Sequence, residues 1–206
     1  MKKVILLVLA IVSIQFTSCK SEAKKDTSNS TAKEEKTAKF SVQKAQNNID
    51  WVAYKTTEKL PVKGAFKKIT VTSGGEGNTI KEAIHNTEFN IPVSSIFTND
   101  ESRDFKIKKF FFGMMDNTSL LSGKLILEDD TKGYANLTMN GVTKKLPFTY
   151  TITDKEFKLS GLLMLADWKG EKALTSLNNE CKDLHKGADG ISKTWDEVAI
   201  NISTIF

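Results

Sequence analysis

The sequence predicts an all-β domain: an eight-stranded antiparallel β-barrel with one or two short helices. Three observations lead to this prediction. About eight short runs alternate apolar and polar residues with the period of a strand. Short turns separate the runs, and one of them, Asn140-Gly141, is the strongest short signal for a β-hairpin. The apolar set is also large enough for an eight-stranded barrel, whose interior is filled by side chains or holds one ligand.

The expected strands follow one another along most of the domain. In 142–152 the apolar side chains fall on one face, and threonine and lysine fall on the other. This is the alternation of a half-buried strand. The preceding run, 135–139, has the same pattern, and the Asn-Gly turn joins the two. The clearest expected strands are 49–55, 62–71, 119–127, 135–139, 142–152, 157–165 and 197–206.

Two segments interrupt the strands with helical features. One is short, around 103–112, and is expected to end at Gly113. The other is 171–187, where Gly187 is expected to supply the C-cap. Apolar side chains recur in it at helical spacing, at Leu174, Leu177, Cys181 and Leu184.

Glycines among the inward positions of the strands have two interpretations. Glycine in a strand marks a bend or the close approach of another group. The glycines therefore either turn barrel corners or leave room for a ligand beside large side chains. They are Gly64, Gly123, Gly141 and Gly161.

Residues 1–19 are predicted to be a lipoprotein signal peptide. Two lysines precede an apolar run from Val4 to Ile14, and small residues with a cysteine follow, which is the order of a secretory signal. The apolar run is shorter than the roughly 20 residues that span a bilayer. The sequence FTSC at 16–19 is similar to a bacterial lipobox, whose cysteine is acylated. We therefore expect lipidation at Cys19, the alternative being a simple signal peptide with an incidental cysteine.

Residues 20–39 are predicted to be a flexible tether that precedes the domain at 40–206. The segment has no aromatic residue and no aliphatic side chain larger than alanine, so burial cannot offset the entropy of ordering it. The expected location is the cell envelope, as an outer-membrane-anchored lipoprotein that faces the periplasm or the surface. Lys20, where an aspartate would favour retention in the inner membrane, agrees with this location.

The positive charge of the chain is concentrated before the domain. The chain has 30 basic and 25 acidic residues and a net charge of +5. Eight of the lysines and four of the acidic residues lie in 1–39, so the domain holds 22 basic and 21 acidic residues. Nucleic-acid binding needs a basic stripe, and this balance argues against it.

The sequence carries no catalytic motif and no metal-ligand spacing. Its two histidines, His85 and His185, are far apart. Cys181 is the only cysteine of the domain, so no disulfide can form within it. His185 follows it by four residues, but a lone cysteine on an apolar helix face usually packs rather than reacts. We therefore expect no enzymatic activity, no metal and no cofactor.

The segment RDFKIKKFFFGMM, at 103–115, is unusual in a chain with a mixed-charge surface. Three phenylalanines and two methionines lie directly behind a lysine-rich stretch, with only Gly113 among them. An ordinary surface would not expose such a block. Methionine is flexible and fills irregular apolar space. The block is therefore either a packed plug or the lining of a ligand cavity.

Several segments in combination resemble the YceI-like proteins, a bacterial lipid-binding family. They are WVAYKTTEKLPVKGAF at 51–66, the Ser94-Ser95 pair, RDFKIKKFFFG at 103–113 and LTMNGVTKKLPF at 137–148. The resemblance covers 40–206, and it implies a lipocalin-like barrel that holds a long polyisoprenoid, such as a quinone tail. The common family pattern has a His-Leu pair where Lys106-Ile107 stands, so this chain lacks that histidine.

The resemblance also implies which side chains hold the ligand. Residues 103–109 would form a short helix over one end of the barrel, and the three phenylalanines would turn inward beneath it. The implied function is to bind and sequester or carry a polyisoprenoid or isoprenoid quinone as a membrane-tethered lipoprotein. The expected ligand-binding residues are Phe66, Phe110, Phe111, Phe112, Met114, Met115, Leu125, Phe148, Tyr150 and Leu163.

Two alternative functions remain open at this stage. The last expected strand ends in Phe206 after apolar residues in phase, as outer-membrane barrels often do, so a small outer-membrane barrel is one alternative. The other is a surface interaction module with a filled core and no ligand. The identity of the lipid and the oligomeric state are also open.

Overall fold

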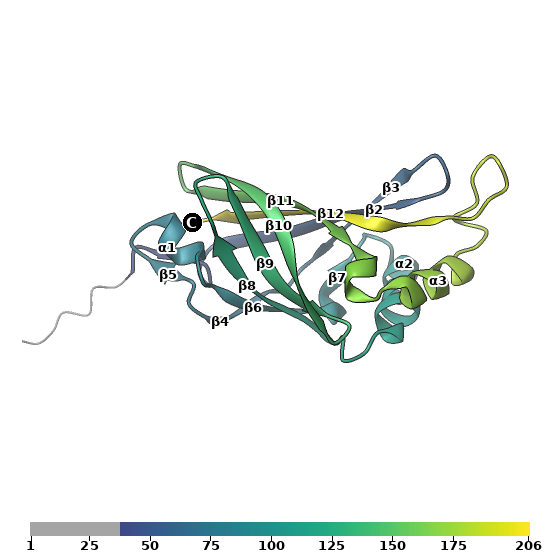
Figure 1. The fold of residues 1–206 in the computed structure, drawn as a ribbon, viewed down its shortest axis with the longest axis horizontal. Coiled ribbons are helices and arrows are strands. Elements are labelled where there is room, and N and C mark those ends of the chain that lie inside the picture. Colours follow the sequence, from purple (N-terminus) through teal and green to yellow (C-terminus); the bar gives the residue numbers. More distant parts are fainter. Residues whose placement is uncertain (1–37) are drawn as a thin grey trace, which may run out of the picture. The chain divides into compact units, whose positions relative to one another are not determined.

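Ten antiparallel strands form the main sheet in the computed structural model, which describes residues 38–206 (Figure 1). A second, small sheet pairs β1 (Phe40–Ser41) with β5 (Glu76–Gly77). Eight strands of the main sheet have five or more residues, and only the two edge strands are shorter. The all-β, lipocalin-like antiparallel fold is confirmed, and each of the seven predicted ranges overlaps a long strand of the main sheet. The range 62–71 runs across two strands, β3 and β4, and β6 was not predicted. Across the sheet the order is β4 (Thr70–Ser73), β6 (Glu88–Pro92), β8 (Leu120–Leu127), β9 (Lys132–Met139), β10 (Val142–Thr153), β11 (Glu156–Met164), β12 (Thr194–Ile205), β2 (Gln46–Lys55), β3 (Leu60–Phe66) and β7 (Ile96–Phe97).

The sheet curls into a half-barrel, and two short connections hold its edges near each other. β3, beside one edge, continues into β4 at the other edge through residues 67–69. Each residue spans at most about 3.6 Å, so the two edges must lie close together there. β6 likewise continues into β7 through the 3-10 turn η1 (Val93–Ser95). The backbone N–H of Lys67 donates to the carbonyl of Ser95 at 2.9 Å and joins the two connections.

The inner face of the sheet forms the core by the alternation that the sequence predicts. In β10, Phe148 and Tyr150 are buried, while Thr149 between them is exposed. Asn140 and Gly141 both have positive φ, 53° and 66°, as a two-residue type I′ turn requires. The predicted hairpin of β9 and β10 is therefore confirmed.

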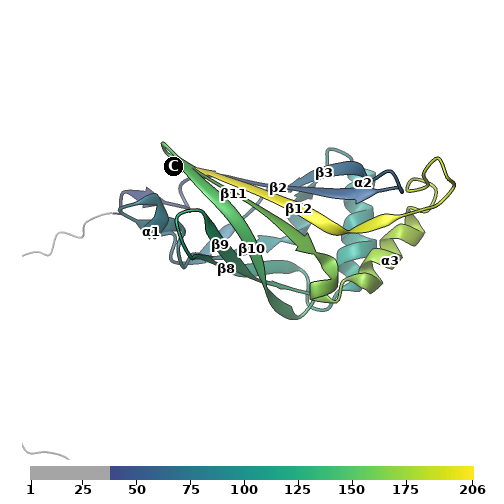
Figure 2. The same ribbon diagram turned by 45° about the horizontal axis from the view of Figure 1, so that its top comes forward.

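Helices lie at both ends of the half-barrel (Figure 1, Figure 2). At one end is α1 (Ile80–Ile84), which the sequence analysis did not predict. At the other end are α2 (Glu101–Lys106), the π-helical turn η2 (Ile107–Phe111), the 3-10 turns η3 (Phe112–Met114) and η4 (Leu165–Trp168), and α3 (Glu171–Glu180).

The first predicted helical segment is confirmed and is slightly longer than expected. It begins at Glu101, because the side chain of Asp100 caps the helix by accepting the backbone N–H of Arg103 at 3.0 Å. Its turns continue to Met114, one residue beyond the expected stop at Gly113.

The second predicted helix is confirmed as α3, but its predicted end at Gly187 is wrong. The helix ends at Glu180, with Cys181 at the C-cap. The carboxamide oxygen of Asn178 accepts hydrogen bonds from the hydroxyls of Ser192 and Thr194. These bonds tie the last turn of α3 to the segment that leads into β12, and the chain leaves the helix axis there.

Residues 38–206 form one unit with its own sheet and core. The predicted signal peptide, the lipidation at Cys19 and nearly all of the tether lie outside the described residues. Within the described part, no helix has the length and apolar character needed to cross a membrane.

Candidate functional site

An apolar chamber lies between the inner face of the sheet and the helical end of the half-barrel. Its volume is about 120 Å³, and its surface is almost wholly apolar. Strands from both halves of the curled sheet line the chamber, and η2 and α3 line its remaining side. The lining residues are Trp51, Ala53, Phe66, Ile96, Ile107, Phe111, Phe112, Leu121, Met139, Leu163, Leu165, Leu174, Leu177, Thr194, Trp195, Val198 and Ile200.

Two of the three consecutive phenylalanines point into this chamber. Phe111 and Phe112 are both 8% exposed, and their rings meet edge to face with centroids 4.9 Å apart. The ring of Phe112 also meets that of Phe66 on β3 at 6.3 Å. The π-helical turn places them where α2 passes into η3, and turns of this kind often occur at functional sites.

A buried carboxylate anchors the helical segment that carries these rings. Asp104 in α2 is 8% exposed. One of its oxygens accepts the backbone N–H of Thr98 at 2.8 Å and the hydroxyl of Thr98 at 2.7 Å. Arg103 does not pair with Asp104; its guanidinium lies 3.5 Å from Asp100. Asp104 therefore fixes α2 to the end of β7.

Phe110 and Met114 do not share the inward orientation that the sequence analysis expected. Phe110 is half-buried, Met114 is 44% exposed, and both line a separate groove against the outer side of α3. Consecutive residues on a helix point about 100° apart, so three in a row cannot all face one cavity. Met115 is buried in the core but does not line the chamber. A ligand contact of these residues stays a prediction.

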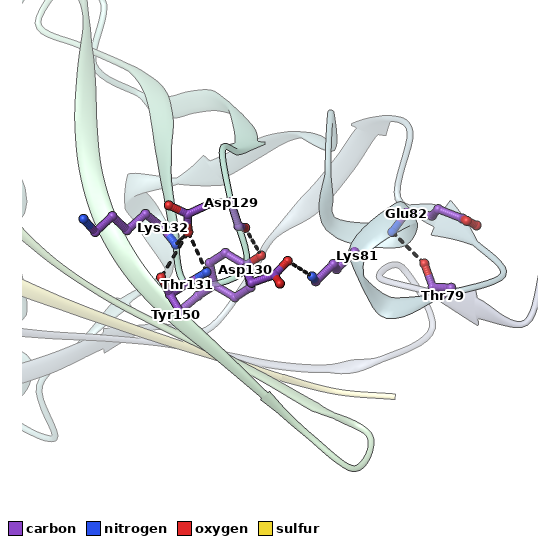
Figure 3. Close-up of polar contacts among 8 residues, drawn as sticks. All are labelled: Thr79, Lys81, Glu82, Asp129, Asp130, Thr131, Lys132 and Tyr150. Carbon is purple, nitrogen blue, oxygen red and sulfur yellow. Dashed lines mark hydrogen bonds and ion pairs between the residues drawn. The ribbon is translucent and has the colours of Figure 1, made fainter.

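Leu125, Phe148 and Tyr150 lie away from the chamber, toward the end that α1 covers. The Tyr150 hydroxyl donates to the carbonyl of Asp129 at 2.5 Å. Beside it, Lys81 of α1 pairs with Asp130 at 2.5 Å (Figure 3). These contacts tie α1 to the turn between β8 and β9, and they leave the Tyr150 hydroxyl already bonded. The chamber thus contains Phe66, Phe111, Phe112 and Leu163 of the predicted ligand-binding residues.

A second, more polar cavity adjoins the chamber and opens toward solvent. We call it the mouth; its volume is about 210 Å³. It shares Trp51, Ala53, Ile107, Leu177 and Thr194 with the chamber. Its polar side adds Lys55 of β2, Asp100, Ser102, Arg103 and Lys106 at α2, and His185.

Two further ionisable side chains line the mouth, His185 and Cys181, and both are neutral near pH 7. Burial, with the charges of Lys55 and Lys106, lowers the pKa of His185 to about 4. Its Nδ1 lies 2.7 Å from the Thr194 hydroxyl. Burial raises the pKa of the Cys181 thiol, whereas a nucleophilic cysteine needs a lowered one. The prediction that Cys181 packs is confirmed, since it is 6% exposed. In residues 38–206 no three His, Cys, Asp or Glu side chains gather as metal ligands would.

The sequence analysis missed the part that Trp51 plays at this site. Its indole lines both cavities, and its N–H has no hydrogen-bond partner in the described structure. The sequence pattern could have indicated this role, because Trp51 occupies an inward position of its strand. In the structure it lies opposite Gly64 in the pairing of β2 with β3. A Cβ at Gly64 would overlap the indole ring, and one at Gly123 would meet Phe89 at 2.7 Å. These glycines therefore make room for core aromatic rings and not for a ligand.

Comparisons with known proteins agree with this fold. A solved polyisoprenoid-binding domain from Saccharophagus degradans superposes with a TM-score of 0.55 at 12% identity, covering 82% of this chain and 95% of that one. BcnA from Burkholderia cenocepacia gives 0.52 at 18% identity, with 81% and 99% covered. No curated protein matches the chain. The sequence model of the YceI-like domain matches residues 40–206, which is most of the chain, and the protein therefore belongs to the YceI-like family.

Proposed function

We propose that residues 40–206 bind one long apolar lipid of the polyisoprenoid class, with part of its chain in the chamber. The observation that carries the proposal is the chamber itself, which is almost wholly apolar and is lined by Phe111 and Phe112. The Saccharophagus degradans relative is a polyisoprenoid-binding domain, and this supports the same ligand class here. The proposed role is to sequester or carry the lipid, and it requires no chemical step.

The chamber must widen to hold a long chain. Ligand cavities usually measure roughly 300–1,000 Å³, whereas the chamber and the mouth measure about 120 and 210 Å³. Burying about 40 carbons would contribute a gross ~30 kcal/mol at about 0.8 kcal/mol per CH₂. This exceeds the practical ceiling on affinity of about 18 to 21 kcal/mol. The excess can offset an outward shift of α2, η2 and η3, which cover the chamber.

The proposed setting is the cell envelope, with the domain tethered through an acylated Cys19. The lipobox-like sequence and the tether composition support this setting. One acyl chain gives only marginal membrane binding, and several on one cysteine anchor stably. The outward positions of β10 carry threonine and lysine with one proline, which favours a tethered domain over a barrel embedded in lipid.

The competing function is a ligand-free interaction module, which the small volume of the chamber favours. Native mass spectrometry with organic extraction separates the two, on residues 38–206 purified from the native envelope without detergent. We expect one isoprenoid or quinone for each protein molecule. We also expect its loss in Ala53→Leu, which fills the chamber without adding a polar group. A folded, empty protein that refuses added isoprenoids would establish the packed plug instead.

A further inference from the structure

Three cationic side chains from two elements converge on the mouth. They are Lys55 on β2 and Arg103 and Lys106 on α2. Asp100 is the one carboxylate that lines the mouth. It is already engaged, because it caps α2 and lies 3.5 Å from the guanidinium of Arg103. The ionised groups of the mouth thus leave an excess of two positive charges.

Two of these cations have no acidic partner in residues 38–206. Lys55 donates its ammonium to the backbone carbonyl of Leu184 at 2.9 Å, and Lys106 forms no ion pair with a described residue. The positive potential acts on the groups behind the mouth. Lys55 and Lys106 contribute to the lowered pKa of His185, and the same two lysines with Arg103 act against the raised pKa of Cys181.

A fourth donor stands where the mouth meets the chamber. Trp51 is 7% exposed, and its indole N–H is buried without a partner. Buried polar groups are hydrogen-bonded in nearly all native structures, so an unpaired one calls for an explanation. An indole N–H can only donate. Thr194, which lines the same two cavities, has its hydroxyl bonded to Asn178 and His185 and not to this N–H.

We propose that the mouth binds an anionic head group, a carboxylate or a phosphate monoester, of the lipid whose chain enters the chamber. Such a head group supplies only acceptors and negative charge, which complement three cations and an unpaired N–H. The inference rests on the proposed function, because it places the tail of the same ligand in the chamber. It adds a preference for anionic lipids over neutral ones with the same chain.

The test is calorimetric titration of residues 38–206 with farnesol, farnesoic acid and farnesyl phosphate, below the concentrations at which they aggregate. The three share one chain and differ only in the head group. We expect at least one of the two anions to bind tenfold or more tightly than the alcohol. That advantage should fall as salt screens the charges. A gain for the acid alone or the phosphate alone identifies the head group, and either supports the proposal.

Variants assign the preference to the mouth. In Lys55→Gln/Lys106→Gln the advantage of the anions should shrink to threefold or less, while the affinity for farnesol stays unchanged. Lys67→Gln/Lys158→Gln removes the same charge from sites that do not line the mouth and should keep the wild-type advantage. Trp51→Phe removes the N–H and keeps an aromatic ring, so it should weaken the anions severalfold.

The outcomes separate this inference from the proposed function. If all three compounds bind with equal affinity, the head-group preference is refuted and lipid binding stands. If none binds to a folded protein, the proposed function fails and the head-group inference fails with it. If the anions keep their higher affinity over farnesol in Lys55→Gln/Lys106→Gln, the inference is also overturned, because another surface must then bind the anionic head group.

Discussion

Gly64 and Trp51 face each other across the pairing of β2 with β3, and the indole ring occupies the space that a side chain at Gly64 would need. Trp51 can therefore lie flat against the strand and form one wall of both the chamber and the mouth. A single glycine thus determines the shape of the site from the neighbouring strand.

Gly64→Ala is expected to destabilise the domain by about 1 to 3 kcal/mol, the usual cost of forcing extra atoms into a packed core. The indole must move toward the chamber, so its fluorescence should change as well. Urea denaturation measures the free energy of unfolding. Gly113→Ala is the matched control, since an added Cβ there would meet only the Lys108 carbonyl at 3.3 Å. Equal losses in the two variants would contradict the packing of Trp51 on Gly64.

Asp104→Ala is expected to cost about 1 to 3 kcal/mol, because it leaves the buried N–H of Thr98 without an acceptor and the Thr98 hydroxyl with only the Asp100 carbonyl at 3.3 Å. Asp104→Asn should lose less than half as much, since one oxygen accepts both bonds and the carboxamide retains one oxygen. Urea denaturation of the two variants gives the comparison. If the two variants lose equal stability, the stabilisation comes from the negative charge of Asp104 and not from the position of the oxygen that accepts the two hydrogen bonds.

The features that the sequence predicts correctly are set by neighbours along the chain. Alternation in β10 and the Asn140-Gly141 turn depend on residues next to each other, so the pattern alone predicts the hairpin. The prediction for the end of α3 was wrong because Asn178 bonds to Ser192 and Thr194, which lie beyond the helix. Tertiary contacts of this kind leave no local signal.

The candidate site was predicted only in part for the same reason. The apolar block at 103–115 indicated a cavity or a plug. Consecutive helical residues point about 100° apart, and only the folded structure shows that Phe111 lines the chamber while Phe110 lines the separate groove. The mouth combines Lys55 with Lys106, which come from different elements, and only the fold brings them together.

Phe112→Leu is expected to enlarge the chamber and shift its preference toward longer chains. The ring of Phe112 lines the chamber against Phe66 and Phe111, and leucine leaves part of that volume empty. A volume-reducing swap of this kind should cost about 1 to 2 kcal/mol, within the range for partly filled cavities. Calorimetric titration with isoprenoid alcohols of increasing length measures how affinity depends on chain length. Phe97→Leu, at a 40% exposed position, should leave the preference unchanged; a shift in both variants would argue against the chamber as the tail site.

The half-buried His185 gives the domain a pH dependence with a defined window. Its pKa is lowered to about 4 in the folded state, against about 6.5 in an unfolded chain. The unfolded state therefore binds the proton first as the pH falls. The stabilising contribution is complete above pH 6.5 and is lost between pH 6.5 and pH 4. After discounting for partial exposure, we expect the free energy of unfolding to fall by about 1 to 2 kcal/mol over this window.

Urea denaturation at half-unit steps between pH 7 and pH 4 measures this loss. His185→Gln should flatten the curve there, because glutamine does not titrate. Asp100 and Asp129 have lowered pKa values through backbone hydrogen bonds from Arg103 and Thr131. Their contributions disappear only below about pH 4, outside the window. A fall that persists unchanged in His185→Gln would mean that other groups drive it, and that His185 is solvated in the folded state.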